Sequence, residues 1–157
     1  MQLYAEGKHA EIMAAVDACL PKDEAGNLIE SQEKSDVVYD LLAFLAERML
    51  EMNKQKQQEI KGFRGWLEGY VGAKVEDLTP KTKLQSYYEH DFVSFLAVIK
   101  KNKTKLAIDP ARRKEGDDLK AEFEGSLSKL RPLLERIQKT DRLIDQVVYK
   151  LYGLTEE

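Results

Sequence analysis

Two aspartates and a lysine in the second half of the chain are of the residue types found in the active site of a metal-dependent nuclease. Asp109 is a lone carboxylate, and Asp118-Leu119-Lys120 matches the acid-x-Lys triplet of such enzymes. Nuclease motifs of this kind lie on strands, whereas these residues fall in a region with helical periodicity. We therefore predict no nuclease site here and no catalytic residue elsewhere in the chain.

The two histidines and the single cysteine lack the neighbours that chemistry at these side chains needs. Glu6 and His9 form one Glu-x-x-His pair, but a di-iron bundle needs two such pairs and further acids. A tyrosine stands three residues before His90. No histidine pattern accompanies Cys19, so cysteine catalysis has no support, and we expect Cys19 to be a small core residue. The sequence predicts no metal site and no cofactor.

A basic segment is the main candidate for binding. Between positions 81 and 114 there are nine basic and three acidic residues, which gives +6, and because the whole chain carries −3 the remainder carries −9. Basic residues grouped in this way either stay solvated or contact phosphates, where each contact releases a counterion. The predicted DNA-binding residues are Lys81, Lys83, Lys100, Lys101, Lys103, Lys105, Arg112, Arg113 and Lys114.

A second candidate surface lies near the C-terminus. Arg142, Asp145, Tyr149 and Tyr152 recur at spacings of 3, 4 and 3, which places them on one face of a helix, opposite its apolar stripe. Tyrosine and arginine are favoured anchors of protein interfaces. We predict that these four residues dock against another element, within the domain or on a partner; the alternative is that they lie on the surface. Asp141, on the apolar stripe, is expected to be a capping or hydrogen-bonded acid, or to contact DNA-recognition elements or another domain.

The elements that carry these residues are expected to be helices. A first helix over residues 3–20 precedes a polar loop that ends at residue 30. Apolar residues then repeat in heptads, which predicts one helix over residues 36–70, starting near Ser31 or Ser35. A break near Gly62 is the main alternative, since glycine weakens helices.

Proline and glycine mark the later helix ends. Thr79-Pro80 and Asp109-Pro110 each match an N-cap followed by proline at the first helical position. The first pair predicts a helix up to about residue 103, and the second predicts one that kinks or restarts at Pro132. Gly153 and Leu154 are placed to end the last helix as a left-handed cap and its apolar contact.

These patterns predict an all-α protein, a helical bundle with a long antiparallel helix pair. The pair would be formed by residues 36–70 and 119–151, within a single domain 1–157 that consists of an N-terminal helix and loop (1–30) and a bundle (31–157). No apolar run approaches the roughly 18 residues of a membrane span, and no signal peptide is recognisable. A single cysteine suits a reducing compartment, so we expect a cytoplasmic protein.

The C-terminal run Asp141-Arg-Leu-Ile-Asp-Gln-Val-Val-Tyr-Lys-Leu-Tyr-Gly-Leu-Thr-Glu-Glu resembles the tail of type IIG restriction–modification enzymes and related adenine-specific DNA methyltransferases. Shorter segments also resemble that family, in the same order and spacing. They are Leu45-Ala-Glu-Arg-Met-Leu-Glu-Met-Asn53, Phe63-Arg-Gly-Trp-Leu-Glu68, Asp77-Leu-Thr-Pro-Lys-Thr-Lys-Leu84 and Lys100-Lys-Asn-Lys103. The resemblance therefore covers roughly residues 38–157.

The resemblance implies a helical module without activity of its own. Family methyltransferases carry a glycine-rich cofactor loop and an Asn-Pro-Pro-aromatic catalytic motif, and neither occurs in this sequence. We expect the chain to support target recognition and to contact DNA phosphates weakly, without sequence preference. Its other expected partners are the methyltransferase and endonuclease domains of a parent enzyme, and a second copy of the chain. The alternative function is an assembly or dimerisation module that does not touch DNA.

Overall fold

The computed structural model describes residues 1–29 and 33–153, and their contacts divide the chain into two compact units. Unit 1 comprises residues 1–52 and 136–157, and unit 2 comprises residues 53–135. The described residues contain helices and no strand, apart from an isolated bridge between Lys22 and Leu28. The all-α prediction is confirmed, whereas the single domain stays a prediction.

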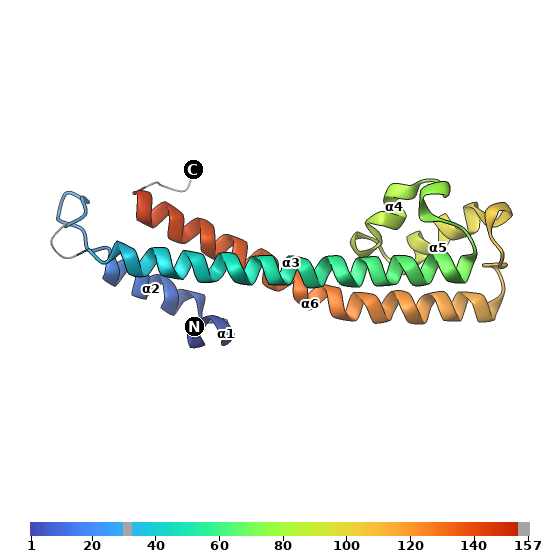
Figure 1. The fold of residues 1–157 in the computed structure, drawn as a ribbon, viewed down its shortest axis with the longest axis horizontal. Coiled ribbons are helices and arrows are strands. Elements are labelled where there is room, and N and C mark those ends of the chain that lie inside the picture. The colour runs from blue at the N-terminus through green and yellow to red at the C-terminus, as the bar shows by residue number, and fades with distance from the viewer. Residues whose placement is uncertain (30–32, 154–157) are drawn as a thin grey trace. The chain divides into compact units, whose positions relative to one another are not determined.

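Two long helices, α3 (Ser35–Val71) and α6 (Arg113–Tyr152), contribute one half to each unit (Figure 1). Within each unit the two halves run antiparallel and share a core, so the predicted helix pair is confirmed. Helix α3 continues through Gly62, so the alternative of a break there is wrong. Pro132 lies inside α6, where the helix does not restart. Its missing N–H removes one hydrogen bond from a helix that has apolar packing on both sides of this position.

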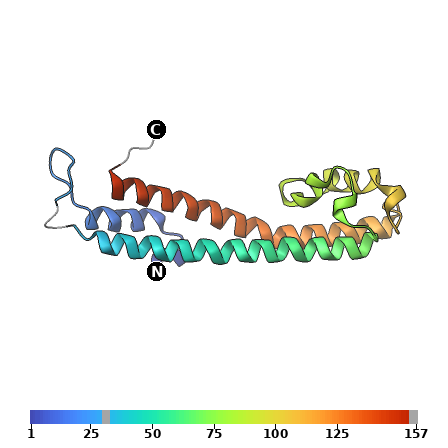
Figure 2. The ribbon, with the colours of Figure 1, turned by 45° about the horizontal axis from the view of Figure 1, so that its top comes forward.

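Unit 1 adds two short helices to the pair. Helices α1 (Gln2–Ala5) and α2 (His9–Cys19) precede α3, and α2 lies beside the first half of α3 (Figure 2). Their core consists of Ile12, Val16, Leu20, Val38, Leu45, Leu143, Val147 and Leu151. The prediction of one helix over residues 3–20 is wrong. Gly7 has φ 71°, and the Lys8 N–H donates to the Leu3 carbonyl at 2.9 Å, so the first helix ends there.

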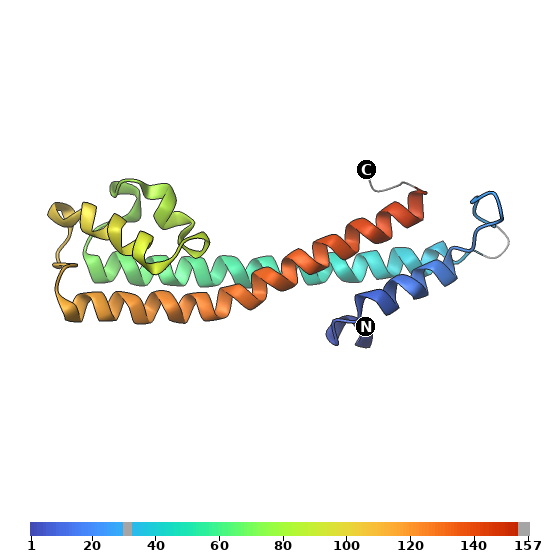
Figure 3. The same ribbon diagram turned by 180° about the vertical axis from the view of Figure 1, so that it is seen from behind.

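In unit 2, short helices pack against one face of the paired segments of α3 and α6 (Figure 3). These are η1 (Val75–Asp77), α4 (Lys81–Gln85), η2 (Tyr87–Glu89), α5 (Phe92–Lys101) and η3 (Lys103–Lys105). The core contains Phe63, Leu67, Val71, Val75, Leu78, Leu84, Tyr87, Phe95, Val98, Ile99, Leu119, Phe123, Leu127 and Leu130. The single helix predicted between residues 80 and 103 is therefore wrong. Asp91 starts a new helix, because its side chain accepts a hydrogen bond from the Ser94 N–H at 2.7 Å.

Neither predicted cap-plus-proline pair caps a helix through its side chain. Pro80 takes the N-cap position of α4, because the Thr79 N–H and carbonyl are both bonded to the Asn102 side chain, at 3.0 and 2.9 Å. Asp109 instead closes a turn by accepting from the Ala111 N–H at 3.0 Å, and α6 begins only at Arg113. Local turn geometry thus competes with helix initiation at both positions.

Two of the glycines with positive φ follow the ends of the long helices, where the backbone turns. Gly153, with φ 66°, follows α6 as predicted, whereas Leu154 and Ser31 lie outside the described residues. Gly72, with φ 71°, follows α3, and the Ala107 N–H donates to the Val71 carbonyl at 2.8 Å. A Cβ added at Gly72 would stand 2.6 Å from the Ala107 Cβ. Glycine is therefore required at position 72 by both its φ and the space.

The unit 2 core includes tyrosines whose hydroxyls are satisfied internally. Tyr87 is buried, and its hydroxyl shares a 2.6 Å hydrogen bond with the Ser126 hydroxyl. Burial raises the pKa of Tyr87 to about 12, although the bond to Ser126 opposes the rise. Burial, and then a 2.7 Å hydrogen bond donated to Asp118, raises the pKa of Tyr70 to about 12. Both side chains are therefore held in the neutral form in the native state.

We expect the free energy of unfolding to fall as pH rises between about 10 and 12. Tyrosine in an unfolded chain ionises near pH 10, so across this interval the native state binds more protons and ionisation favours the unfolded state. Below about pH 10 the full contribution is present. Urea unfolding at closely spaced pH values should show a shallower loss for Tyr87→Phe than for the wild type. An unchanged slope in Tyr87→Phe and in Tyr70→Phe would contradict the assignment.

None of the described helices combines the length and the apolar content that crossing a membrane requires.

Candidate nucleic-acid interface

The nine predicted DNA-binding residues all lie in unit 2 and are all exposed. Lys81 and Lys83 are on α4, and the others follow one another along the end of α5, η3 and the start of α6. The structure therefore brings the nine residues into one unit, as the basic segment predicted.

The end of α5 determines how four of these lysines are presented. Asn102 is the C-cap of α5, and its buried side chain also accepts from and donates to the Thr79 backbone. Lys100 and Lys101 occupy the last turn of α5, where basic side chains are favoured by the helix dipole. Lys103 and Lys105 follow directly on η3. A buried anchor thus holds the backbone from which exposed cations project.

Four of the nine cations have partners within the protein. Lys81 pairs with Glu76 at 3.2 Å, and Lys103 pairs with Asp109 at 3.3 Å. Lys105 donates to the Asp77 carbonyl at 2.8 Å, and Arg113 pairs with Asp117 at 3.7 Å. Within residues 1–29 and 33–153, the other five form no ion pair or side-chain hydrogen bond: Lys83, Lys100, Lys101, Arg112 and Lys114. These five are the side chains most accessible to an external anion.

Asp109 opposes part of this positive charge. The hydrogen bond from the Ala111 N–H, and then the contact with Lys103, lower the pKa of Asp109, so it is ionised at neutral pH. The Asp109 carboxylate forms an ion pair with Lys103 and interacts electrostatically with Arg112 at longer range. Lys100 and Lys101 have no such acid beside them among the described residues.

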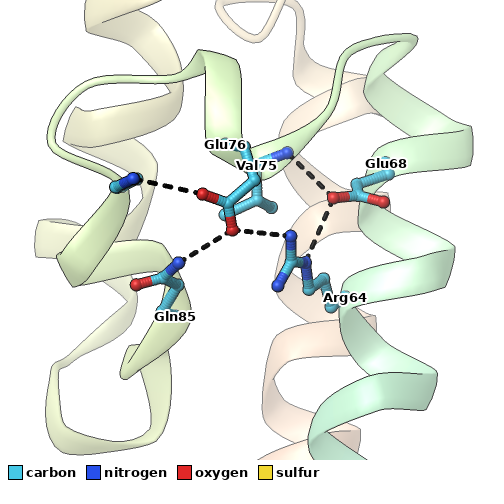
Figure 4. Close-up of polar contacts among 6 residues, drawn as sticks. Arg64, Glu68, Val75, Glu76 and Gln85 are labelled. Atoms are coloured by element: carbon cyan, nitrogen blue, oxygen red, sulfur yellow. Dashed lines mark hydrogen bonds and ion pairs between the residues drawn. The ribbon is translucent and has the colours of Figure 1, made fainter.

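A network of charges joins α4 to α3 inside unit 2 (Figure 4). Arg64 donates to Glu68 at 3.1 Å and to Glu76 at 2.9 Å. Glu76 also accepts from Gln85 at 2.9 Å and from Lys81, and these contacts lower its pKa. Glu68 accepts from the Val75 N–H at 2.9 Å, which is the main cause of its lowered pKa. Lys81 thus belongs to the network that joins α4 to α3 and is already paired within the unit.

The residues of nuclease type each contact other partners in unit 2. Asp118 and Lys120 lie on α6, where Asp118 accepts from the Tyr70 hydroxyl and Lys120 pairs with Glu124 at 3.8 Å. Asp109 is engaged with Lys103. In the part of the chain that the structure describes, no three His, Cys, Asp or Glu side chains are grouped as metal ligands would be.

The four predicted docking residues lie in unit 1. Arg142, Asp145 and Tyr152 are exposed, and Tyr149 is half-buried. Tyr152 is 62% exposed but shares a hydrogen bond with Tyr39 of α3, which raises the pKa of Tyr39. The docking of these four residues stays a prediction.

The structure also shows where three other side chains of unit 1 discussed from the sequence lie: Asp141, Cys19 and His9. Asp141 is exposed, so it does not lie on the buried stripe, and its expected role as a capping or hydrogen-bonded acid or as a contact to another element stays a prediction. The buried positions are instead Leu143 and Val147, one turn apart, and Thr140. Cys19 packs at the edge of the unit 1 core, and His9 stacks on Tyr4 with ring centroids 6.1 Å apart.

Sequence reasoning missed two features of these units. One is Asn102, whose single side chain holds the Thr79 backbone and the Val98 carbonyl, and whose only sequence signal is its position after a lysine pair. The other is an apolar groove in unit 1, lined among others by Val37, Leu41 and Phe44. The spacing of 4 and 3 in these residues is a second helical stripe, which could have revealed the groove.

Residues 35–148 match the model of a family described as a domain of unknown function (DUF8810). The chain belongs to this family. The matched segment runs from the first residue of α3 to within the last turns of α6 and contains all nine candidate cations, whereas α1 and α2 lie outside it. No curated protein and no solved structure matches the chain.

Proposed function

We propose that this chain is a non-catalytic helical module of a cytoplasmic DNA restriction–modification methyltransferase, and that unit 2 contacts DNA phosphates. The observation that carries the DNA contact is a set of five exposed cations that form no ion pair or side-chain hydrogen bond with the described part of the chain: Lys83, Lys100, Lys101, Arg112 and Lys114. The enzyme context is supported by the resemblance of the C-terminal run and of the shorter segments before it.

The expected mode of binding follows from the kind of side chain. Lysine and arginine contacts to phosphates position a protein on a duplex but do not read its sequence. Such contacts release counterions, so the logarithm of the binding constant falls linearly with the logarithm of the salt concentration. Binding by this chain should therefore be weak, indifferent to sequence and steeply reduced by salt. In a parent enzyme it would add to contacts made by the other domains.

The test compares two triple variants with the same change in charge. The first replaces Lys100, Lys101 and Arg112 by Gln, and the matched control replaces Lys22, Lys34 and Arg136 of unit 1, which are equally exposed. Fluorescence anisotropy with a labelled duplex should show that the first triple weakens binding by about tenfold or more at low salt. Its salt slope should also be smaller by about 2 to 3, since each lost phosphate contact removes about 0.9.

The control triple should bind as the wild type does, and both triples should keep their helical circular dichroism. Absence of duplex binding by the wild-type chain at low salt would contradict the proposal. Equal weakening by the two triples would also contradict it, because net charge rather than the unit 2 cluster would then explain the binding.

The second candidate function is assembly onto other protein domains without DNA contact. The specific observation in its favour is the apolar groove of unit 1, which is open to solvent although apolar residues line it. The two functions use different units, so the DNA measurements above and peptide binding to the groove distinguish them.

A further inference from the structure

The groove of unit 1 is an apolar surface lined by residues of α1, α2 and α3. It has a volume of about 280 Å³. Its lining includes Leu3 and Tyr4 from α1, Ala15 from α2, and Val37, Leu41 and Phe44 from α3. It is lined by two helices that pack side by side, and an apolar groove of this kind can accept a third helix.

The floor of the groove belongs to the buried core of unit 1, and its edge is apolar. Ile12, Val16 and Val38 line it and belong to the buried core of unit 1. At the edge, Met1 is 77% exposed and Val37 is 49% exposed. An apolar side chain entering here would remove these surfaces from water, at about 25 cal/mol for each Å² buried.

Unit 1, which contains the groove, is acidic as a whole, and two aspartates lie along the α3 side of the groove. Unit 1 contains eight lysines and arginines and fifteen aspartates and glutamates, a formal charge of −7, whereas unit 2 contains seventeen and thirteen, which gives +4. Asp40 lines the groove directly, and Asp36 lies one turn earlier on the same exposed edge of α3. Arg48 stands at one end, where its guanidinium lies over the Phe44 ring at 5.4 Å. An acidic edge favours a basic occupant and disfavours a second copy of the same acidic unit.

We propose that this groove binds the apolar face of a basic amphipathic helix from a partner protein. Apolar side chains at helical spacing would fill the groove between α2 and α3, and lysines or arginines on either side of that face would lie against Asp36 and Asp40. This interaction is separate from the DNA contact, because it uses unit 1 and residues of opposite charge.

Peptide binding tests the proposal. The probe is a synthetic helix of about 20 residues, long enough to be helical in isolation, with leucines at helical spacing and lysines on the other face. A matched peptide carries glutamate in place of each lysine. By fluorescence anisotropy, the lysine peptide should bind the full chain about tenfold or more tightly than the glutamate peptide, and salt should reduce the difference.

Two variants on the same helix locate the site. Val37→Lys places a charge at the groove edge, and Leu50→Lys makes a comparable change at an exposed leucine that does not line the groove. Val37→Lys should weaken the lysine peptide by about tenfold, whereas Leu50→Lys should leave it unchanged. In methyl spectra of the labelled chain, the peptide should shift Ile12, Val16 and Val38.

Three outcomes would overturn the proposal. The first is no binding of the lysine peptide. The second is equal weakening by Val37→Lys and Leu50→Lys, because the peptide would then be held by the general charge of unit 1. The third is self-association of the wild-type chain that Val37→Lys abolishes, because the occupant would then be a second copy.

Discussion

Phe123→Ala should lower the free energy of unfolding of unit 2 by about 3–5 kcal/mol. Phe123 is 1% exposed, and its ring lies 4.9 Å from that of Phe95, 5.6 Å from Phe92 and 6.1 Å from Tyr87. These neighbours come from η2 and α5, and Phe63 of α3 lies 6.4 Å away. Truncation therefore removes contacts that join every layer of unit 2, and the rigid rings around the site cannot close the cavity.

Urea unfolding followed by circular dichroism measures this effect. Leu50→Ala is the control, because Leu50 is 74% exposed and its truncation should change stability by less than about 0.5 kcal/mol. A loss below about 1 kcal/mol for Phe123→Ala would contradict the description of this aromatic cluster as the centre of the unit 2 core.

Asn102→Ala should cost about 2–4 kcal/mol, more than an average side-chain hydrogen bond. The Asn102 amide accepts from the Thr79 N–H at 3.0 Å and donates to the carbonyls of Thr79 and Val98 at 2.9 and 2.8 Å. Asn102 is 5% exposed and its bond to the Val98 carbonyl is buried, so alanine would leave that carbonyl without this donor and would also release the Thr79 backbone from its two bonds. Each buried group left unsatisfied costs about 1–3 kcal/mol.

Hydrogen exchange should show the same loss locally, as faster exchange of the Thr79 amide in the variant. Asn27→Ala in the exposed loop of unit 1 is the matched control, and it should have little effect on stability. Unchanged exchange at Thr79 in Asn102→Ala would mean that this side chain does not hold the segment before α4.

The long helices could be predicted because their signals are repeated many times. The heptad spacing of α3 runs from Val38 to Tyr70, and enough of its positions are buried to keep the helix continuous through Gly62. The shorter elements were less predictable, because single side chains decide them. Gly7 ends α1, and Asp91 starts α5, each against a helical pattern that continues in the neighbouring sequence.

The residues of the candidate site and their exposure could be predicted from the sequence. Which of these residues have partners inside the protein could not. Exposure of the basic segment followed from its composition, since nine cations near one another resist burial. Their partners did not follow, because Lys81 meets Glu76 through the fold of unit 2, and Lys105 meets the Asp77 carbonyl from 28 positions away. The unit 1 groove is likewise only partly predictable, because the stripe of Val37, Leu41 and Phe44 marks its α3 side, whereas its other walls depend on how α1 and α2 pack on α3.

Gly72 and Ala107 approach so closely that the size of the residue at one position limits the size of the residue at the other. With 2.6 Å between the Ala107 Cβ and a Cβ at position 72, a side chain at 72 would need the segment before α6 to move away, and a larger residue at 107 would meet the backbone of position 72. Among other members of the family, position 72 should therefore stay glycine and position 107 should stay small. A sequence that enlarged either residue would have to change the spacing between α5 and α6, and with it the places of the exposed cations that this segment carries.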